Sequence, residues 1–426
     1  MALTPEGYIQ RLIDSKIEKH LKIFGAVSVE GPKWCGKTWT VSNHANSITG
    51  LTDRNNRDLA EIDPETALKG EEPHAIDEWQ VVPEIWDAVR HEVDKKTTKG
   101  RFLLTGSEVP EEEKDSSKKK ILHSGTGRIS TIRMRTMTLY ESGNSSEEIS
   151  LSAVLDGKPI KPGIIKTSPI ELSTMACVGG WPGILGIEAA DAIELPNSYI
   201  ERLVNSKTAS GKAKIRNQDN FRFFLSSLAR NSASLVSNST LHNEVQSASG
   251  EFSAITLSSY LQILRNQYVL EEVPGWNPRI RSKARILQAP KRFFTDPSLA
   301  AAALGATPKI FLNDWQAFGG IFENLCLRDL LVYAELFGAR LYHYRDNSNL
   351  EVDAILEFPD SSWGAFEIKL SEKGAVSGIK SLLALKNKME KAGHIPPRCL
   401  AVITGSGIAQ RRDDGVYVIP ITMIRE

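Results

Sequence analysis

The chain has 426 residues, of which 41% are hydrophobic and 24% are charged, and its formal net charge is zero. This composition is that of an ordinary folded globular protein, and the length allows two or three domains. A neutral chain has no overall electrostatic attraction to nucleic acid or to a membrane surface, although a local basic patch is compatible with it. The N-terminus lacks the apolar core of a signal peptide, and no apolar run is long enough to span a bilayer. We therefore expect a cytoplasmic protein that does not associate with membranes.

The cysteines and histidines argue against a disulfide-linked or zinc-binding protein. The four cysteines lie far apart and form no C-x-x-C pair, and the eight histidines do not cluster at the spacing of metal ligands. Disulfides and a zinc site are therefore not expected, which fits a reducing compartment.

The N-terminal region contains a phosphate-loop pattern in the structural context that the pattern requires. Apolar residues at helical spacing predict a helix over residues 8–24, and residues 26–29 predict a buried strand. The pattern G-x-x-x-x-G-K-[ST] then follows in full as Gly31, Pro32, Lys33, Trp34, Cys35, Gly36, Lys37 and Thr38. Residues 38–41 predict the first turn of a helix, so the loop joins a strand to a helix N-terminus.

The ligands expected at this loop are ATP and Mg²⁺. Glycines let the backbone curl so that its N–H groups point at a phosphate tail, and the helix N-terminus adds a partial positive charge there. Lys37 would reach the β- and γ-phosphates, and the Thr38 hydroxyl would hold Mg²⁺. The alternative is a chance glycine turn.

A pair of adjacent acids follows the next strong apolar segment. Asp77 and Glu78 come directly after the short apolar run that ends at Ile76, and a helix is predicted over residues 83–93. We interpret them as a Walker B pair, in which Asp77 binds Mg²⁺ directly or through water and Glu78 polarises the attacking water. An Asp-Glu pair on its own is often only a helix cap.

A further buried strand is predicted over residues 101–107 and ends in small polar residues. Because strand carboxyl ends face the nucleotide in a parallel sheet, Thr105 or Ser107 would contact the γ-phosphate, and a plain turn is the alternative. A charge-rich, solvated loop is expected at residues 111–120. Arg128 then precedes a strand predicted over residues 129–139. Arg128 is a candidate arginine finger, in cis or in trans, or else a surface arginine.

These motifs together resemble one group of known ATPases. The quoted stretches are Gly-Pro-Lys-Trp-Cys-Gly-Lys-Thr, Ile-Asp-Glu-Trp-Gln and Leu-Leu-Thr-Gly-Ser, followed by the Cys-Val-Gly-Gly-Trp-Pro-Gly turn at residues 177–183. They resemble the AAA-type P-loop ATPases of bacteria and archaea whose ATPase domain is fused to a C-terminal domain of unknown function. The resemblance implies an ATP-binding protein, with an ATPase domain over residues 1–188. Residues 142–168, rich in Ser, Gly, Glu and Pro, are expected to form a linker or insertion.

The middle of the chain, residues 189–305, predicts a helical domain that ends in two strands at residues 268–273 and 285–294. Helices followed by a two-stranded wing are the order of a winged helix. Basic residues in this wing would suit a DNA backbone, namely Arg279, Arg281, Lys283, Arg285, Lys291 and Arg292. A solvated hairpin, an inter-domain contact or a protein–protein module are the alternatives.

The last part, residues 306–426, predicts a helix, three strands, a helix and a strand. Asp353 lies on one strand, while Glu367 and Lys369 lie on the next and point to the same face. With Glu323 on the preceding helix, the acids would share Mg²⁺ and Lys369 would position a water for phosphodiester cleavage. The resembling group carries a restriction-endonuclease-like core of this kind, although a structural ion-pair network would use the same residues.

We therefore expect an α/β protein made of a P-loop parallel sheet, a helical winged-helix-like region and a restriction-endonuclease-like α/β domain. The leading function is ATP binding with slow, partner-dependent hydrolysis that drives a conformational change. One alternative is an ATP-regulated, Mg²⁺-dependent DNA nuclease, and another is a nucleotide-stabilised scaffold without enzymatic activity. Homo-oligomerisation is compatible with the sequence.

Overall fold

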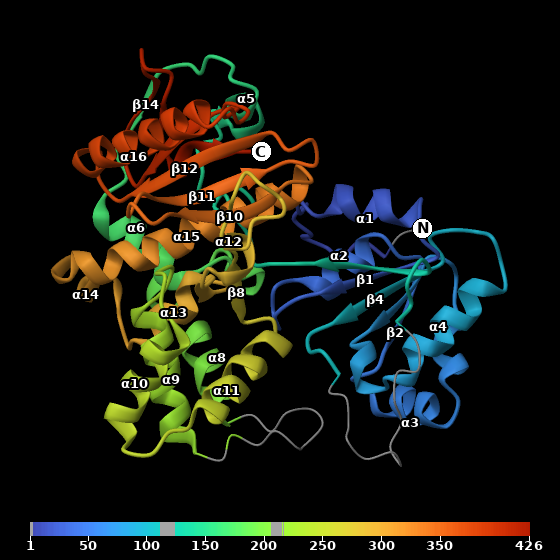
Figure 1. Cartoon of the computed structure of the whole chain (residues 1–426). Helices are drawn as coiled ribbons and strands as arrows, with labels where there is room; N and C mark the ends of the chain where they lie inside the picture. The colour runs from blue at the N-terminus through green and yellow to red at the C-terminus, as the bar shows by residue number, and fades with distance from the viewer. Residues whose placement is uncertain (1–2, 111–123, 206–214, 216) are drawn as a thin grey trace.

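The structure is a computed structural model that describes residues 3–110, 124–205, 215 and 217–426. An N-terminal α/β part, a helical middle part and a C-terminal α/β part follow one another along the chain, coloured blue to cyan, green to yellow, and orange to red in Figure 1. The loop expected at residues 111–120 lies within residues 111–123, which are outside the described ranges.

The N-terminal part is built on a five-stranded sheet in the order β2-β3-β4-β1-β5. Every pair in it is parallel, so all the carboxyl ends lie along one edge. The strands are β1 (Ala26–Glu30), β2 (Ser47–Gly50), β3 (His74–Asp77), β4 (Phe102–Gly106) and β5 (Ile129–Arg133). Apolar clusters cover both faces, which explains the continuous apolar runs of the central strands. The predicted α/β class with a parallel P-loop sheet is confirmed.

The helices of this part are α1 (Asp14–Leu21), α2 (Lys37–Asn43), α3 (Arg54–Ile62) and α4 (Glu84–Asp94). The helix predicted over residues 8–24 is therefore too long. The Asp14 carboxylate accepts the backbone N–H of Arg11 at 2.9 Å and the hydroxyl of Tyr8 at 2.8 Å, and this fixes the preceding segment in a non-helical path. The strand predicted over residues 129–139 also ends early, at Arg133, because the chain leaves the sheet there.

The middle part is mainly helical, with one antiparallel hairpin. Its helices are α6 (Pro169–Val178), α7 (Ala189–Ala192), α8 (Glu194–Asn205), α9 (Gln218–Arg230), α10 (Asn238–Ser249), α11 (Ala254–Asn266), α13 (Pro297–Ala303) and α14 (Pro308–Asn313). The hairpin pairs β8 (Leu270–Val273) with β9 (Lys291–Phe294), and the short helix α12 (Ala284–Leu287) lies in the connection. The second predicted strand, at residues 285–294, was thus wrong in its first half.

The C-terminal part contains a seven-stranded sheet in the order β10-β11-β12-β13-β15-β14-β7. Its elements are α15 (Trp315–Leu336), β10 (Arg340–Arg345), β11 (Glu351–Glu357), β12 (Trp363–Lys369), α16 (Glu372–Lys391), β13 (Leu400–Thr404), β14 (Gly407–Arg411) and β15 (Tyr417–Pro420). The order from α15 to β13 is the predicted helix, three strands, helix and strand. No helix in the described ranges combines the length and apolarity needed to cross a bilayer.

The segment expected to be a linker or an insertion, residues 142–168, contributes strands to the C-terminal sheets. Within it, β6 (Ile149–Ser150) pairs with β16 (Ile424–Arg425), α5 (Leu151–Leu155) follows, and β7 (Gly163–Ile165) pairs with β14. The next helix, α6, packs against α13, α14 and α15. The N-terminal sheet therefore ends well before the predicted domain boundary at residue 188, because the intervening strands find their partners in the last part of the chain.

A buried ion-pair network joins the three parts. Arg328 on α15 is 1% exposed and pairs with Asp296 at 3.2 Å and Asp329 at 2.7 Å. Asp329 also accepts the backbone N–H of Leu139 at 3.0 Å, and Asp296 accepts that of Gly180 at 3.0 Å. Two segments from the first half of the chain are thus held by one guanidinium and its two carboxylates.

Replacing Arg328 with Met is expected to lower the free energy of unfolding by about 3–5 kcal/mol, because two buried carboxylates lose their cation. Urea denaturation measures it. The control is Arg222→Met on α9, where an exposed ion pair with Glu201 is lost and a change of about 1 kcal/mol or less is expected. Equal changes in the two variants would show that the buried network adds nothing special.

Candidate functional site

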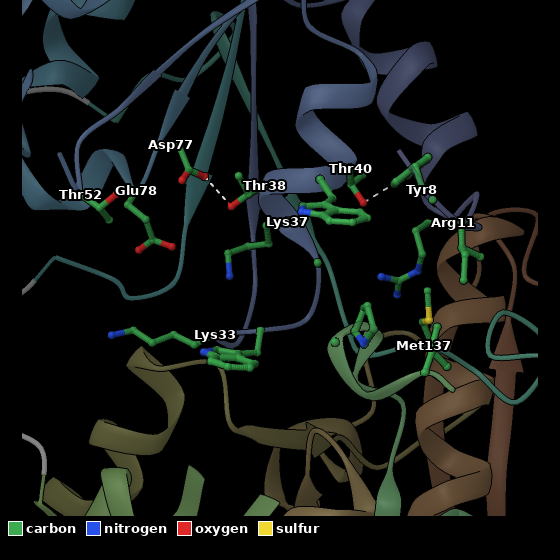
Figure 2. Close-up of a pocket in the computed structure, with 18 residues that line it drawn as sticks. Tyr8, Arg11, Lys33, Lys37, Thr38, Thr40, Thr52, Asp77, Glu78 and Met137 are labelled. Carbon is green, nitrogen blue, oxygen red and sulfur yellow. Dashed lines mark hydrogen bonds between the residues drawn. The ribbon is translucent and has the colours of Figure 1, made fainter. Parts of the chain in front are cut away.

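A cavity of about 700 Å³ opens at the carboxyl edge of the five-stranded sheet. Figure 2 shows the side chains around it, with Lys37 and Thr38 facing Asp77 and Glu78. Residues 182–185 and the N-terminal segment at residues 7–11 complete its wall. The cavity is therefore built by separate stretches of sequence around the phosphate loop.

The loop itself needs glycine at two positions. Gly36 has a φ of 102°, which is left-handed. A Cβ at Gly31 would lie 2.2 Å from the carbonyl oxygen of Met134, so no side chain fits there. The Lys37 ammonium lies inside the curved loop, where it donates to the carbonyls of Gly31 at 3.0 Å and Pro32 at 2.8 Å. The Lys37 side chain is almost fully buried.

The hydroxyl of Thr38 and the carboxylate of Asp77 meet across the sheet edge, 2.8 Å apart. Asp77 also accepts the hydroxyl of Thr105 at 2.7 Å. Thr105 reaches it because β4 lies between β1 and β3 in the sheet. Hydroxyl and carboxylate oxygens are the ligands that Mg²⁺ prefers, so Thr38 and Asp77 fit such an ion.

Glu78 has a left-handed backbone, with a φ of 60°. Its N–H donates to the Thr105 hydroxyl at 2.9 Å, and its carboxylate accepts from Ser107 at 2.6 Å and from Gln80 at 2.5 Å. These bonds hold a half-buried carboxylate at the cavity wall. Thr105 and Ser107 therefore contact the two acids, and neither lies on the cavity wall itself.

The remaining loop residues divide between the cavity mouth and the interior. Lys33 and Trp34 are exposed at the mouth, where 62% of Trp34 is accessible, whereas Cys35 is fully buried behind the loop.

Arg128 is not brought to the cavity. It precedes β5, whose start pairs with the start of β1, whereas the phosphate loop follows the end of β1. The five residues of β5 span roughly 16 Å at about 3.3 Å per residue. Arg128 is exposed and pairs with Asp94 at 2.9 Å. Its geometry is incompatible with an arginine finger acting on the loop of its own chain.

The cavity also uses residues that sequence reasoning missed. Tyr8 and Arg11 come from the N-terminal segment, and Pro182 and Gly183 come from the glycine-tryptophan-proline turn. This turn approaches the chain beyond β5 so closely that a Cβ at Gly180 would lie 2.0 Å from the carbonyl oxygen of Met137. Only glycine fits there. The turn was recognised only through its resemblance to a family, and no local pattern marked Tyr8 or Arg11.

Half of the basic residues in the wing predicted to contact DNA form ion pairs within the protein. Lys291 is 1% exposed, Arg292 pairs with Glu272 at 2.8 Å, and Arg285 pairs with Glu357 at 2.5 Å. The other three cations are exposed, namely Arg279, Arg281 and Lys283. The six cations therefore do not form one solvent-facing surface, because half of them neutralise acids across the fold.

The residues of the predicted nuclease site do come together, but around ammonium groups. Lys369 lies 3.0 Å from Asp353 and 2.5 Å from Glu367. Lys291, arriving from β9, lies 2.6 Å from Glu323 and 3.4 Å from Asp353. Sequence reasoning missed Lys291 in this cluster because its neighbours in sequence suggested a solvated wing.

The geometry of this cluster, with an ammonium group against each acid, is that of an ion-pair network. Burial raises the pKa values of the Glu323 and Glu367 carboxyls. Burial alone would also raise the pKa of Asp353, but Lys291 and Lys369 hold it below its usual value. Within the described ranges, no group of acids, histidines and cysteines is arranged to hold a metal ion. The space between the acids is taken by the two lysines.

Three family models match successive parts of the chain. An AAA domain matches residues 24–142, a domain of unknown function (DUF8612) matches residues 170–310, and a domain of unknown function (DUF4143) matches residues 318–424. The first match contains the phosphate loop, both acids and the end of β4. The N-terminal part is therefore similar to an AAA domain over the whole of its parallel sheet and phosphate loop.

Related whole proteins carry no assigned activity. The uncharacterized proteins Rv2008c of Mycobacterium tuberculosis and Mb2031c of Mycobacterium bovis are each 23% identical over 368 residues, which cover 85% of this chain and 74% of each relative. Among solved structures, the Walker-type ATPase paby2304 of Pyrococcus abyssi is 12% identical, with a TM-score of 0.42 and coverage of 71% of this chain and 97% of that chain. The ORC2 protein of Aeropyrum pernix is also 12% identical, with a TM-score of 0.31 and coverage of 64% and 91%. These scores are too low to support a functional argument.

Replacing Lys291 with Met is expected to destabilise the fold by about 3–5 kcal/mol, because Glu323 and Asp353 then lose a buried cation. Urea denaturation against Lys283→Met, which removes an exposed lysine, measures the difference.

The same interpretation predicts no Mn²⁺ binding by the C-terminal cluster. The ion is titrated into an Asp77→Asn variant, which lacks the carboxylate facing Thr38, and followed by electron paramagnetic resonance. Binding that disappears on the further change Asp353→Ala would contradict the ion-pair network.

Proposed function

We propose that this protein binds ATP together with Mg²⁺ and hydrolyses it slowly, and that hydrolysis changes the contacts between the ATPase domain and the rest of the chain. One observation carries the proposal: the Lys37 ammonium, the Thr38 hydroxyl and the Asp77 and Glu78 carboxylates all lie on one cavity at one sheet edge. A cation, a metal-ligand pair and a base are the groups that phosphoryl transfer requires.

Phosphate binding rests on the loop and on α2. The N–H groups at the start of α2 are free of intrahelical partners and add a partial positive charge, which suits a polyphosphate. Lys37 sits in the curl of the loop on two carbonyl acceptors and would exchange them for phosphate oxygens, which are the stronger partners because they are charged.

Thr38 and Asp77 would hold Mg²⁺, which when bound supplies positive charge to the phosphates. Glu78 would take a proton from the attacking water or orient it, since its carboxylate lies at the cavity wall. The bonds from Ser107 and Gln80 fix that carboxylate, so its orientation does not depend on the ligand.

Slow turnover follows from the absence of a free guanidinium. Among the described residues that line the cavity, Arg11 is the one arginine, and its donors are engaged by protein acceptors. A charge that stabilises the transition state would then have to come from a partner molecule, which suits hydrolysis that depends on a partner.

The coupling route that we propose is the β8–β9 hairpin. Glu30, the residue directly before Gly31, accepts the hydroxyl of Tyr268 at the base of β8. Glu271 on β8 pairs with Arg133 at 3.2 Å and with Arg135 at 3.0 Å. The other strand of the hairpin carries Lys291 into the C-terminal acid cluster. A shift of the loop would thus reach the C-terminal sheet through one short hairpin.

Changing Lys37 to Ala is expected to abolish tight ATP binding, because the ammonium that meets the β- and γ-phosphates is lost. Isothermal titration is the measurement. Lys33→Ala is the matched control, since Lys33 is exposed at the mouth of the same cavity and should retain binding. Wild-type affinity in the Lys37 variant would exclude this loop as the nucleotide site.

Changing Glu78 to Gln is expected to leave ATP binding intact and to slow hydrolysis roughly a hundredfold or more, the usual contribution of a positioned base. Phosphate release under saturating ATP and Mg²⁺ measures it. Glu71→Gln, an exposed acid outside the cavity, serves as the control. An unchanged rate would mean that Glu78 only shapes the turn after β3.

A further inference from the structure

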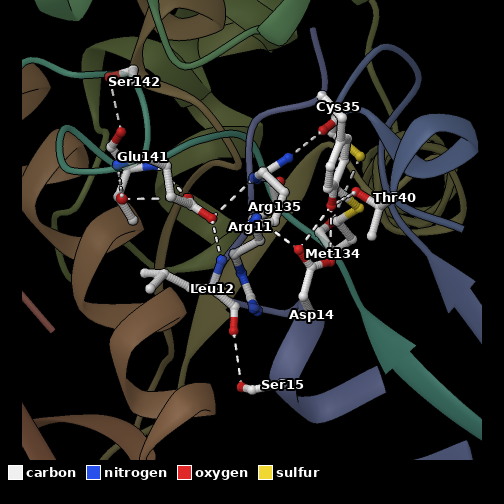
Figure 3. Close-up of polar contacts among 12 residues, drawn as sticks. Arg11, Leu12, Asp14, Ser15, Cys35, Thr40, Met134, Arg135, Glu141 and Ser142 are labelled. Atoms are coloured by element: carbon white, nitrogen blue, oxygen red, sulfur yellow. Dashed lines mark hydrogen bonds and ion pairs between the residues drawn. The ribbon is translucent and has the colours of Figure 1, made fainter. Parts of the chain in front are cut away.

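Arg11 is a buried cation that lies against the phosphate loop. It is 4% exposed, and its guanidinium makes three hydrogen bonds within the protein. It donates to the carbonyl of Cys35 at 2.8 Å, to the carbonyl of Arg135 at 2.9 Å, and to the carboxylate of Glu141 at 2.9 Å, as Figure 3 shows. One of its partners is therefore the main chain of the phosphate loop itself.

That bond fixes the peptide between Cys35 and Gly36. A trans peptide is planar, so the carbonyl oxygen of one residue and the N–H of the next point in opposite directions. Because Arg11 holds the Cys35 oxygen, the Gly36 N–H must point away from the guanidinium. In a phosphate loop the ligand is held by N–H groups that point into the curl.

Glycine at position 36 makes such a restraint necessary. Gly36 has no Cβ and already adopts a φ of 102°, so its peptide has conformations open to it that other residues lack. If this peptide turned over, a carbonyl oxygen would face the phosphate oxygens and repel them. Arg11 lies close by, since a Cβ at Gly36 would be 3.3 Å from its terminal nitrogen.

Arg11 is itself held in place by the protein. Glu141 is 8% exposed and also accepts the N–H groups of Leu12 at 2.8 Å and Thr138 at 2.9 Å. The carboxylate therefore anchors the guanidinium from the side away from Cys35. The charge of Arg11 is balanced without any ligand, so its role does not require contact with a phosphate.

We propose that Arg11 is a positioning residue for the phosphate loop, which sets the Cys35–Gly36 peptide so that the Gly36 N–H donates to the β-phosphate of a nucleotide. The inference rests on the proposed ATP binding and adds the residue that aims one of its donors. It assigns Arg11 to binding of the β-phosphate in particular, and AMP has no β-phosphate for the Gly36 N–H to meet.

The test compares AMP, ADP and ATP in titrations of the full chain. Arg11→Gln should weaken ADP and ATP roughly tenfold to a hundredfold, the value of one hydrogen bond to a charged group, and leave AMP affinity unchanged. Arg11→Lys should restore part of the loss, because one ammonium can still donate to the Cys35 carbonyl. A general loss of packing would affect all three nucleotides and would not be rescued in this way.

The matched control is Arg101→Gln. Arg101 is 2% exposed and bonds Glu72 at 2.9 Å and Glu92 at 3.0 Å, but it precedes β4 and so lies at the sheet edge opposite the loop. All three nucleotide affinities should stay at wild-type values in this variant.

If Arg11→Gln does not fold, Glu141→Gln decides the question, since it keeps Arg11 and removes the negative charge of its anchor. Glu141→Gln should lower ADP affinity more than AMP affinity, and the loss of ADP affinity should be smaller than the loss expected for Arg11→Gln. Wild-type ADP affinity in whichever variant folds, or an equal loss for AMP and ADP, would overturn the assignment of Arg11 alone. Failure of the wild-type chain to bind ADP or ATP would overturn the proposed function and this inference with it.

Discussion

The Arg328 guanidinium between Asp296 and Asp329 is the contact on which the arrangement of this molecule depends. All three side chains are almost fully buried, and the two carboxylates also accept from the N–H groups of Leu139 and Gly180 and from nearby hydroxyls. A buried charge group of this kind tolerates no missing partner, because each unpaired member carries a desolvation cost of several kcal/mol. The chain leaving β5 meets Asp329 of this group on α15, and the chain entering the glycine-tryptophan-proline turn meets Asp296 before α13.

The nucleotide cavity inherits its shape from that constraint. Gly180 is bonded to Asp296, and Pro182, two residues later, forms part of the cavity wall. Arg11 bonds the phosphate loop at Cys35. Its other partner, Glu141, lies in the chain segment after β5, two residues beyond Leu139. The contacts that shape the cavity wall are therefore connected to the contacts that pack the C-terminal part.

The sequence predicts the parts of the site that lie in recognisable motifs and misses the residues that no motif marks. The spacing of Gly31 to Thr38 and the position of Asp77 at a strand end are set by neighbours in sequence, so the α/β class and the acid side of the cavity follow from them. Arg11, Pro182 and Lys291 act on residues that are remote in the chain, and a single sequence contains no record of such pairings. Lys291 was assigned to a solvent-facing wing because its sequence neighbours are basic, whereas its burial is decided by Glu323 and Asp353 across the fold.

Because β7 pairs with β14, a C-terminal fragment that begins at the boundary of a family match lacks a strand of its own sheet. The matches end at residue 142 and begin again at residue 170, and the strands that complete the C-terminal sheets lie in the gap. A C-terminal half excised without residues 149–165 would expose the backbone of β14 as an unpaired edge, which invites aggregation. Recombination that exchanges C-terminal halves between such proteins must carry this short segment along or leave a mismatched sheet.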